Sequence, residues 1–483
     1  MNRIKVDDIS KFVLIGLLLS SLLFNNGFYV FLPLLTVFVL LYFVQQPHTP
    51  GVFSLIIIQH FLQIAAGVWL CNYLEKDINY NTPSRSTAII AACIGLCFLM
   101  SPVIYFQNKI PRQTFASLRE SVNKFSPQKV MYAYLVSFFL ASSLGASAFL
   151  FGGLTQVIFS FVKVKWILFL LFGYQSILNK KNMRLLVLFV CLEFFTGFLG
   201  FFSDFKTVIF FLVVLLISLA EKLEFKHVVY AGLIGYLLVF FGLAWSSIKG
   251  DYRRFLNGGQ KSQAVVVEQG QAVDKLIDLS NDLNKEKLEG AVVGFLDRLQ
   301  YTYHFAKTID RVPSVLPFEN GRNWLTSLEF TTTPRIFNPN KPLYEATVKT
   351  KKYTGIRYAG RLDGVSFSLG YFPDSYIDFG LYGMMVVLLV LGTLYGKIYF
   401  YLLKKTSNNI VFNYATVCAF FLEFNALEMD STYLLGRLFA SLVTFYVLIK
   451  FFFPVFIKWL SNHKPIDELK LSKNLLNEKI AYK

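Results

Sequence analysis

Two cations lie in a stiff stretch of the sequence, residues 333–342, which reads TPRIFNPNKP. Its three prolines restrict the backbone and therefore limit the directions in which Arg335 and Lys341 project. A guanidinium donates two parallel hydrogen bonds to a phosphate or a carboxylate. The stretch predicts that Arg335 and Lys341 bind a phosphate or pyrophosphate. The alternative is that Arg335 pairs with a nearby carboxylate and only shapes a loop.

Four further cations lie beside predicted helices, and they are Lys206, Arg253, Arg254 and Arg298. Lys206 ends the sequence GFFSDFK at a helix start, where a positive charge opposes the helix dipole. That mild cost favours a functional role, although a lysine can also lie at a membrane surface with its ammonium in water. Arg298 lies on a predicted amphipathic helix that also carries His304. We expect these cations to lie around the same face of the molecule.

Two carboxylates, Asp374 and Asp378, are four residues apart where a predicted helix enters the membrane, so they share one helix face. Carboxylates at this depth are costly and are therefore candidates for catalysis, although Asp374 could instead cap the helix. The last predicted span contains Arg437, whose charge needs a partner in apolar surroundings. We expect Glu428 and Asp430, just outside that span, to pair with it.

Aromatic residues also lie near these charges, namely Trp324, Tyr353, Tyr358 and Tyr371. The sequence has no Walker motif, no Gly-rich dinucleotide loop, no nucleophile elbow and no Cys/His metal pattern. Its five cysteines lie in apolar runs and do not indicate a disulfide framework. We therefore expect neither a cofactor nor a bound metal.

Long apolar runs must position these side chains. Of the 483 residues, 55% are hydrophobic and only 16% are charged, whereas a soluble domain has about 25% charged residues. The mean hydropathy is +0.50. The runs predict an all-α, polytopic membrane helix bundle with about 12 spans. The predicted spans are 12–24, 28–44, 52–74, 87–106, 130–150, 164–178, 184–202, 206–220, 227–247, 376–402, 409–427 and 433–457.

Two segments allow more than one interpretation. Residues 12–44 could form a tight hairpin around 25–27 or a single long tilted segment. Residues 151–163 are apolar but run into Lys163 and Lys165, so this segment could lie at the membrane surface or re-enter the membrane.

The distribution of charge predicts the orientation in the membrane. The net charge is +17, and the basic residues gather in short segments between apolar runs, as is typical of cytoplasmic loops rather than of nucleic-acid binding. We expect a multi-pass inner-membrane protein in contact with membrane lipid, with both termini in the cytoplasm. The predicted divisions are spans 1–9 in residues 1–247, a large periplasmic loop at 248–375, spans 10–12 in 376–459 and a basic tail at 460–483.

From residue 200 to residue 383 the sequence resembles the Wzy-like oligosaccharide repeat-unit polymerases of the Bacteroidetes type, which make O-antigen or exopolysaccharide. The resemblance rests on GFFSDFK at 200–206, YRRF at 252–255, VP and PFENG within 312–321, PRIFNPNKP at 334–342, KYTG at 352–355 and GVSFSLGYFPDSYIDFGLYG at 364–383. Before residue 200 only the hydropathy pattern matches. The resemblance implies a GT-C-like fold.

The resemblance also implies a reaction without metal or cofactor. On the periplasmic face, a hydroxyl of one repeat unit attacks the anomeric carbon of the growing chain, and undecaprenyl pyrophosphate leaves. The expected catalytic residues are Arg298, Arg335, Asp374 and Asp378. The expected pyrophosphate contacts are Lys206, Arg253, Arg254 and Lys341, and the expected sugar contacts are Trp324 and Tyr371. Tyr353 and Tyr358 could also stack on a sugar face, with loop packing as the alternative for all four rings. Related enzymes carry arginine where this chain has Lys206, which argues against a bidentate role at that position.

The expected partners are the undecaprenyl-pyrophosphate-linked oligosaccharide, a chain-length regulator and a flippase. Three other functions compete with a polymerase. An O-antigen-type ligase would use nearly the same donor site. A flippase would need charges along a cavity at mid-membrane, whereas the charges here concentrate in one outer loop. A structural or receptor role for the loop would leave its polar residues scattered.

Overall fold

The described part of the chain is almost entirely helical. The computed structural model describes residues 4–147, 155–198, 205–260, 265–333, 338, 340–360 and 366–461. Within these ranges the sheet consists of two short parallel strands, β1 (Lys5–Val6) and β2 (Lys222–Leu223). The predicted all-α fold class is confirmed.

Seven helical segments among the described residues are long and apolar enough to cross a membrane, as in a multi-pass membrane protein. They are α2 (Gly27–Val44), α3 (Val52–Tyr73), α4 (Arg85–Gln107), most of α7 (Thr155–Asn179), α10 (Phe225–Leu256), α16 (Tyr371–Lys405), and the run of α18 (Ser431–Val447), η5 (Leu448–Phe452) and α19 (Phe453–Leu460). The other predicted spans coincide with α1 (Asp8–Ser20), α6 (Pro127–Ser147), α8 (Met183–Thr196), α9 (Phe205–Leu219), and α17 (Ile410–Phe421) with η4 (Leu422–Phe424). The count of twelve spans stays a prediction.

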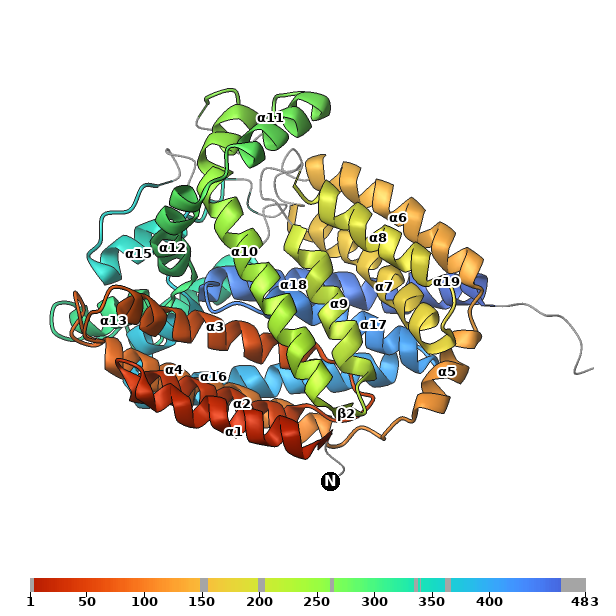
Figure 1. Ribbon diagram of the computed structural model, residues 1–483, viewed down its shortest axis with the longest axis horizontal. Coiled ribbons are helices and arrows are strands. Elements are labelled where there is room, and N and C mark those ends of the chain that lie inside the picture. Colours follow the sequence, from red (N-terminus) through yellow and green to blue (C-terminus); the bar gives the residue numbers. More distant parts are fainter. Residues whose placement is uncertain are drawn as a thin grey trace, which may run out of the picture.

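The N-terminal region forms two helices rather than one tilted segment. A short turn, η1 (Ser21–Leu23), follows α1, and Asn26 then adopts a left-handed conformation with φ 57° before α2 begins. The Asn26 side chain donates to Oδ1 of Asn72 at 2.8 Å and so ties this turn to α3. Figure 1 shows α1 beside α2. In the second ambiguous segment, residues 155–163 belong to α7, and 151–154 lie outside the described residues.

The longest helix, α16, packs closely along α4. A Cβ atom added at Gly392 would lie 2.0 Å from the carbonyl oxygen of Leu99, so only glycine allows this approach of the two backbones. Close to its N-terminus α16 bends at Gly380, where φ is 66° and ψ is −171°. This packing fixes the first turns of α16, which carry Asp374 and Asp378.

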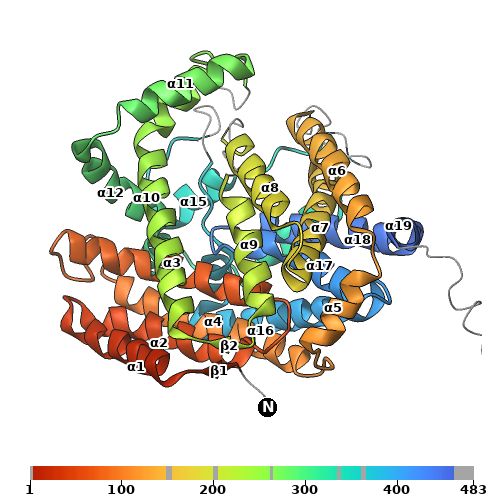
Figure 2. The same cartoon turned by 45° about the vertical axis from the view of Figure 1, so that its right-hand side comes forward.

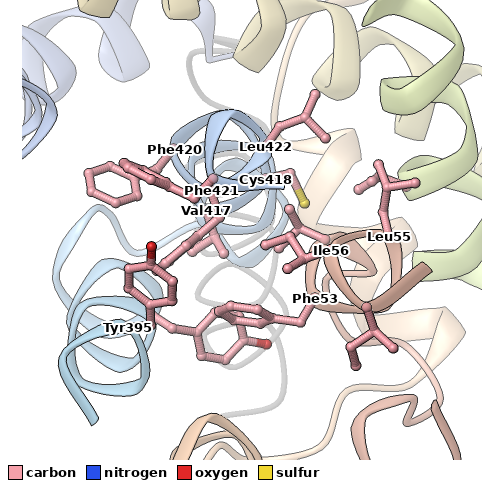
Figure 3. Close-up of a cluster of buried hydrophobic side chains, with 14 of the residues drawn as sticks. Phe53, Leu55, Ile56, Tyr395, Val417, Cys418, Phe420, Phe421 and Leu422 are labelled. Carbon is pink, nitrogen blue, oxygen red and sulfur yellow. The ribbon is translucent and has the colours of Figure 1, made fainter. Parts of the chain in front are cut away.

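Aromatic side chains fill the core where α3, α16 and α17 meet (Figure 3). The rings of Phe53 and Phe421 are 4.9 Å apart, and the ring of Tyr395 lies 5.7 Å from that of Phe421. All three residues are buried. A packed interior therefore holds these three helices together.

The polar region between α10 and α16 folds into helices gathered at one end of the bundle. They are α11 (Gln269–Asn281), α12 (Lys285–Leu299), α13 (Thr302–Arg311), α14 (Arg322–Thr332) and α15 (Ala346–Thr354). Figures 1 and 2 show α11 and α12 over the end of α10, on the side away from α5 (Phe115–Asn123). Because α10 continues to Leu256 and α16 begins at Tyr371, this connection covers 257–370, inside the predicted limits of 248 and 375.

Candidate functional site

Three of the predicted cations, Lys206 and Arg253 for pyrophosphate binding and Arg298 for catalysis, gather around Lys249 near the C-terminal end of α10. The charge of Lys249 interacts with those of Arg253, Arg298 and Lys206, which lie on α10, α12 and α9 respectively. Lys249 and Arg253 are four residues apart and therefore share one face of α10. Like charges repel unless an anion or water lies between them, so this grouping suits an anionic ligand.

A pocket of about 450 Å³ opens between α10, α11 and α12 beside this cluster. Three cations line it, Lys249, Lys287 and Arg298, against a single carboxylate, that of Asp251. The side chain of Asn284 caps α12 by accepting a hydrogen bond from the backbone N–H of Lys287 at 2.9 Å. This cap starts the helix that carries Arg298 into the pocket.

Two glycines of α12 contribute to the space in this pocket. A Cβ atom added at Gly290 or Gly294 would meet no other atom within 4 Å. Glycine within a helix costs about 1 kcal/mol relative to alanine, and close packing, the usual structural reason for it, is missing at both positions. Both residues line the pocket, so their small size keeps room for a ligand.

Half-buried aromatic rings cluster around His304, six residues after Arg298. The ring of His304 lies 5.3 Å from that of Tyr301 and 5.6 Å from that of Tyr358. Burial lowers the pKa of His304 to about 4, so this imidazole is neutral at physiological pH. Partly exposed rings beside a cation could pack against the face of a sugar. Tyr358 was predicted for this role, whereas Tyr353 is buried and its hydroxyl donates to Glu319 at 2.6 Å.

An exposed carboxylate, Glu428, lies on the same side of the molecule. Both Glu428 and Arg298 interact electrostatically with Tyr301. Gln63 of α3 connects the two segments, because its carbonyl accepts from the N–H of Tyr301 at 3.1 Å and its side chain donates to Glu428 at 3.4 Å. From the sequence, Glu428 was expected only as a partner for Arg437, so its place near Tyr301 was missed.

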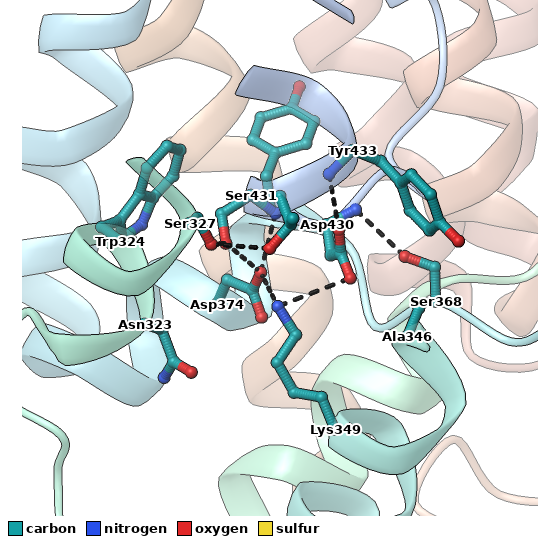
Figure 4. Close-up of polar contacts among 12 residues, drawn as sticks. Asn323, Trp324, Ser327, Ala346, Lys349, Ser368, Asp374, Asp430, Ser431 and Tyr433 are labelled. Carbon is teal, nitrogen blue, oxygen red and sulfur yellow. Dashed lines mark hydrogen bonds and ion pairs between the residues drawn. The ribbon is translucent and has the colours of Figure 1, made fainter. Parts of the chain in front are cut away.

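Asp374 is part of a buried ion-pair network and is inaccessible to a ligand (Figure 4). Its Oδ2 atom lies 2.7 Å from Nζ of Lys349 and accepts hydrogen bonds from the N–H and Oγ of Ser431 at 2.8 and 2.7 Å. Lys349 also lies 3.5 Å from Asp430, which caps α18 through the N–H of Tyr433. Burial lowers the pKa of Lys349, but the two nearby carboxylates have the larger effect and raise this pKa above its ordinary range. The network fastens α15 to α16 and α18.

Asp378, the other predicted catalytic carboxylate, caps α14. The residue before that helix, Gly321, has φ 91° and lacks a side chain that could accept a hydrogen bond from the first N–H groups of the helix. Asp378 replaces the missing cap by accepting from the N–H groups of Asn323 and Trp324 at 3.1 and 2.9 Å. The Trp324 indole in turn donates to Oγ of Ser375 at 3.2 Å. Both side chains therefore hold α14 against α16.

Three other predicted residues, Tyr371, Lys341 and Arg254, do not line the pocket. Tyr371 is buried, and its hydroxyl contacts Nε2 of His60 at 2.7 Å. Lys341 donates to the carbonyl oxygens of Phe330 and Thr333, at the end of α14. Arg254 is exposed in the last turn of α10. Arg335 lies outside the described residues.

The expected pairing of Arg437 with Glu428 and Asp430 is wrong. Within the described part of the chain no ion pair joins these residues, and the guanidinium of Arg437 contacts the thioether of Met429 at 3.6 Å instead. Asp430 lies instead 3.5 Å from Nζ of Lys349, which approaches from α15. Sequence proximity could not reveal a partner 81 residues earlier in the chain.

Comparison with known proteins yields a family but no relative of known activity. No curated protein and no solved structure matches the chain. One family model matches residues 67–457, which include every candidate residue described above. The chain therefore belongs to the family described as a domain of unknown function, DUF8712.

Proposed function

We propose that the protein is a membrane glycosyltransferase that polymerises undecaprenyl-pyrophosphate-linked oligosaccharide repeat units at the periplasmic face of the inner membrane. The observation that carries this proposal is the grouping of Lys206, Lys249, Arg253 and Arg298 beside an open pocket, which Lys249 and Arg298 line. The pocket lies at the end of the bundle where the polar helices gather, and its excess of positive charge matches a pyrophosphate. The motif resemblance from residue 200 to residue 383 supports the same function.

In this reaction the hydroxyl oxygen of one repeat unit forms a bond to the anomeric carbon of another. The bond between that carbon and the pyrophosphate oxygen breaks, and the oxygen keeps the electron pair. Fixed cations next to this oxygen stabilise the negative charge that develops there. Lys249 and Arg298, which line the pocket, are the side chains that we assign to this role.

The hydroxyl that attacks must lose its proton to a base. Asp374 and Asp378 are engaged in buried hydrogen bonds, whereas Glu428 is exposed and lies near Tyr301 beside Arg298. We therefore assign the base to Glu428 and sugar contacts to the rings of Tyr301 and Tyr358. A general base must reach the proton that it removes within hydrogen-bond distance, which an exposed side chain can do.

A gene deletion followed by gel analysis of the surface glycan tests the proposal. Loss of a polymerase leaves single repeat units on the surface, whereas loss of a ligase leaves none. The deletion strain is then complemented with the wild type, with Arg298→Ala, and with Arg184→Ala as a control on an exposed arginine of α8. We expect only Arg298→Ala to fail. Normal polymer length in the deletion strain contradicts the proposal.

A further inference from the structure

Arg437 is a cation inside an apolar helix, and no carboxylate among the described residues forms an ion pair with it. It lies six residues after Ser431, or about 9 Å along the axis from the start of α18, in a segment long and apolar enough to cross a membrane. Its side chain is exposed, and its hydrogen bond to a neighbour within the described ranges is the weak one to Met429. Arginine at such a position is costly unless it meets an anion, another partner or water.

A second cation lies beside it. Lys163 of α7 interacts electrostatically with Arg437. The Lys163 ammonium pairs with Glu423 and donates to Oγ of Ser441 at 2.6 Å, and Ser441 donates to Glu423 at 2.8 Å. Ser441 is four residues after Arg437 and therefore shares its helix face. Glu423 is thus already engaged, and Lys163 and Arg437 together carry one more positive charge than it neutralises.

The surroundings of this group favour an anion attached to a lipid. On α18, Phe439 and Val443 are 43% and 46% exposed on another face of the helix than Arg437, and the whole segment is long and apolar enough to cross a membrane. A soluble anion would have to leave water to reach this depth, whereas a lipid phosphate lies close to it with its chain in the bilayer. The planar guanidinium offers the paired donors that a phosphate accepts.

We infer that Arg437, with Lys163 beside it, forms a binding site for the phosphate group of a membrane lipid, on helices other than those of the loop pocket. The pocket is built by α10, α11 and α12, whereas this site is built by α7 and α18. The inference also deepens the proposed function, on which this further step rests. Polymerisation joins two lipid-linked substrates, and two cationic sites would hold one pyrophosphate each.

Native mass spectrometry of the purified full-length protein tests this inference with geranylgeranyl pyrophosphate as the probe. We expect two bound molecules for the wild type, and one each for Arg437→Gln and Arg298→Ala. Lys450→Gln, which removes an exposed cation from the same apolar segment, should bind two. Arg437→Lys should retain the second molecule with affinity weakened about tenfold, because the paired donors are lost. Glu423→Gln should tighten binding, because it removes the competing negative charge.

Two results would overturn the inference. One is an unchanged number of bound probes and unchanged affinity in both Arg437→Gln and Glu423→Gln. The other is equal competition by inorganic pyrophosphate, which would assign a soluble anion to Arg437 rather than a lipid. The measurement needs no acceptor and no turnover, so failure of this inference can be distinguished from failure of the proposed function. A protein that binds the probe at Arg437 but joins no repeat units supports this inference and refutes the polymerase.

Discussion

Nζ of Lys349 lies 2.7 Å from Oδ2 of Asp374, and this contact joins a helix of the polar region to the first turn of a membrane helix. Asp374 is fully buried, the Lys349 side chain is 13% exposed, and the second carboxylate, Asp430, shares the same ammonium. The network has one cation for two carboxylates, and both carboxylates lie at helix N-termini, where negative charge is favoured. Lys349 therefore attaches α15 of the polar region to α16 and α18 of the bundle.

Lys349→Met should strongly destabilise the protein. The substitution leaves Asp374 and Asp430 buried without their cation, and removing one partner of a buried ion pair costs about 3–5 kcal/mol. Thermal unfolding in detergent should show a lower transition temperature, and proteases should cleave the 257–370 region faster. Lys351→Met, at an exposed position of the same helix, is the matched control. Equal stability of the two variants would show that the buried network does not hold the polar helices.

Gly294→Leu should abolish glycan polymerisation without loss of stability. The added side chain enters the pocket, since no atom lies within 4 Å of the new Cβ, and leucine is favoured over glycine in a helix by up to about 1 kcal/mol. Gly235→Leu makes the same exchange on α10, also into open space but away from the pocket, and should keep activity. The two variants are compared by surface-glycan gels and thermal unfolding. Full polymer length with Gly294→Leu would remove the pocket from the mechanism.

The stability of the protein should fall as the pH drops from about 6.5 toward 4. Burial lowers the pKa of His304 to about 4 in the folded state, whereas an unfolded histidine titrates near 6.5. Between these values the unfolded chain binds a proton that the folded chain does not, which favours unfolding. The contribution of His304 is complete above pH 6.5. His304→Gln should therefore flatten the profile of unfolding temperature between pH 7 and pH 4, and an identical slope in both proteins would contradict this.

The membrane helices and the cationic character of the site could be predicted from the sequence. The contact partners of individual site residues could not. Apolar runs are local, so α2, α3, α4 and α10 were predictable from hydropathy. The cations were predictable because charges are rare beside such runs. The spacing of Asp374 and Asp378 correctly indicated one helix face, but their roles depend on Lys349 and Gly321, which come from other parts of the chain.

Lys249 is a residue of the candidate site that the sequence pattern did not single out. The predicted span ended at residue 247, which made Lys249 one polar residue among many in a loop. In the structure α10 continues for two more turns to Leu256. That extension places Lys249 on the face that meets α12, where it lies in the pocket with Arg298. Contacts between α10 and α12 arise from tertiary packing and are not visible in a local pattern.

The most direct test of the proposed function is reconstitution with a defined substrate. Purified protein in liposomes is given undecaprenyl-pyrophosphate-linked repeat units, and products are separated by size while released undecaprenyl pyrophosphate is quantified. We predict a ladder of polymers with one undecaprenyl pyrophosphate released for each linkage formed, and no ladder with Arg298→Ala or Glu428→Gln. Repeat units that stay unjoined with the wild-type protein, or a ladder of normal length with Arg298→Ala, would contradict the assignment of this pocket to glycosyl transfer.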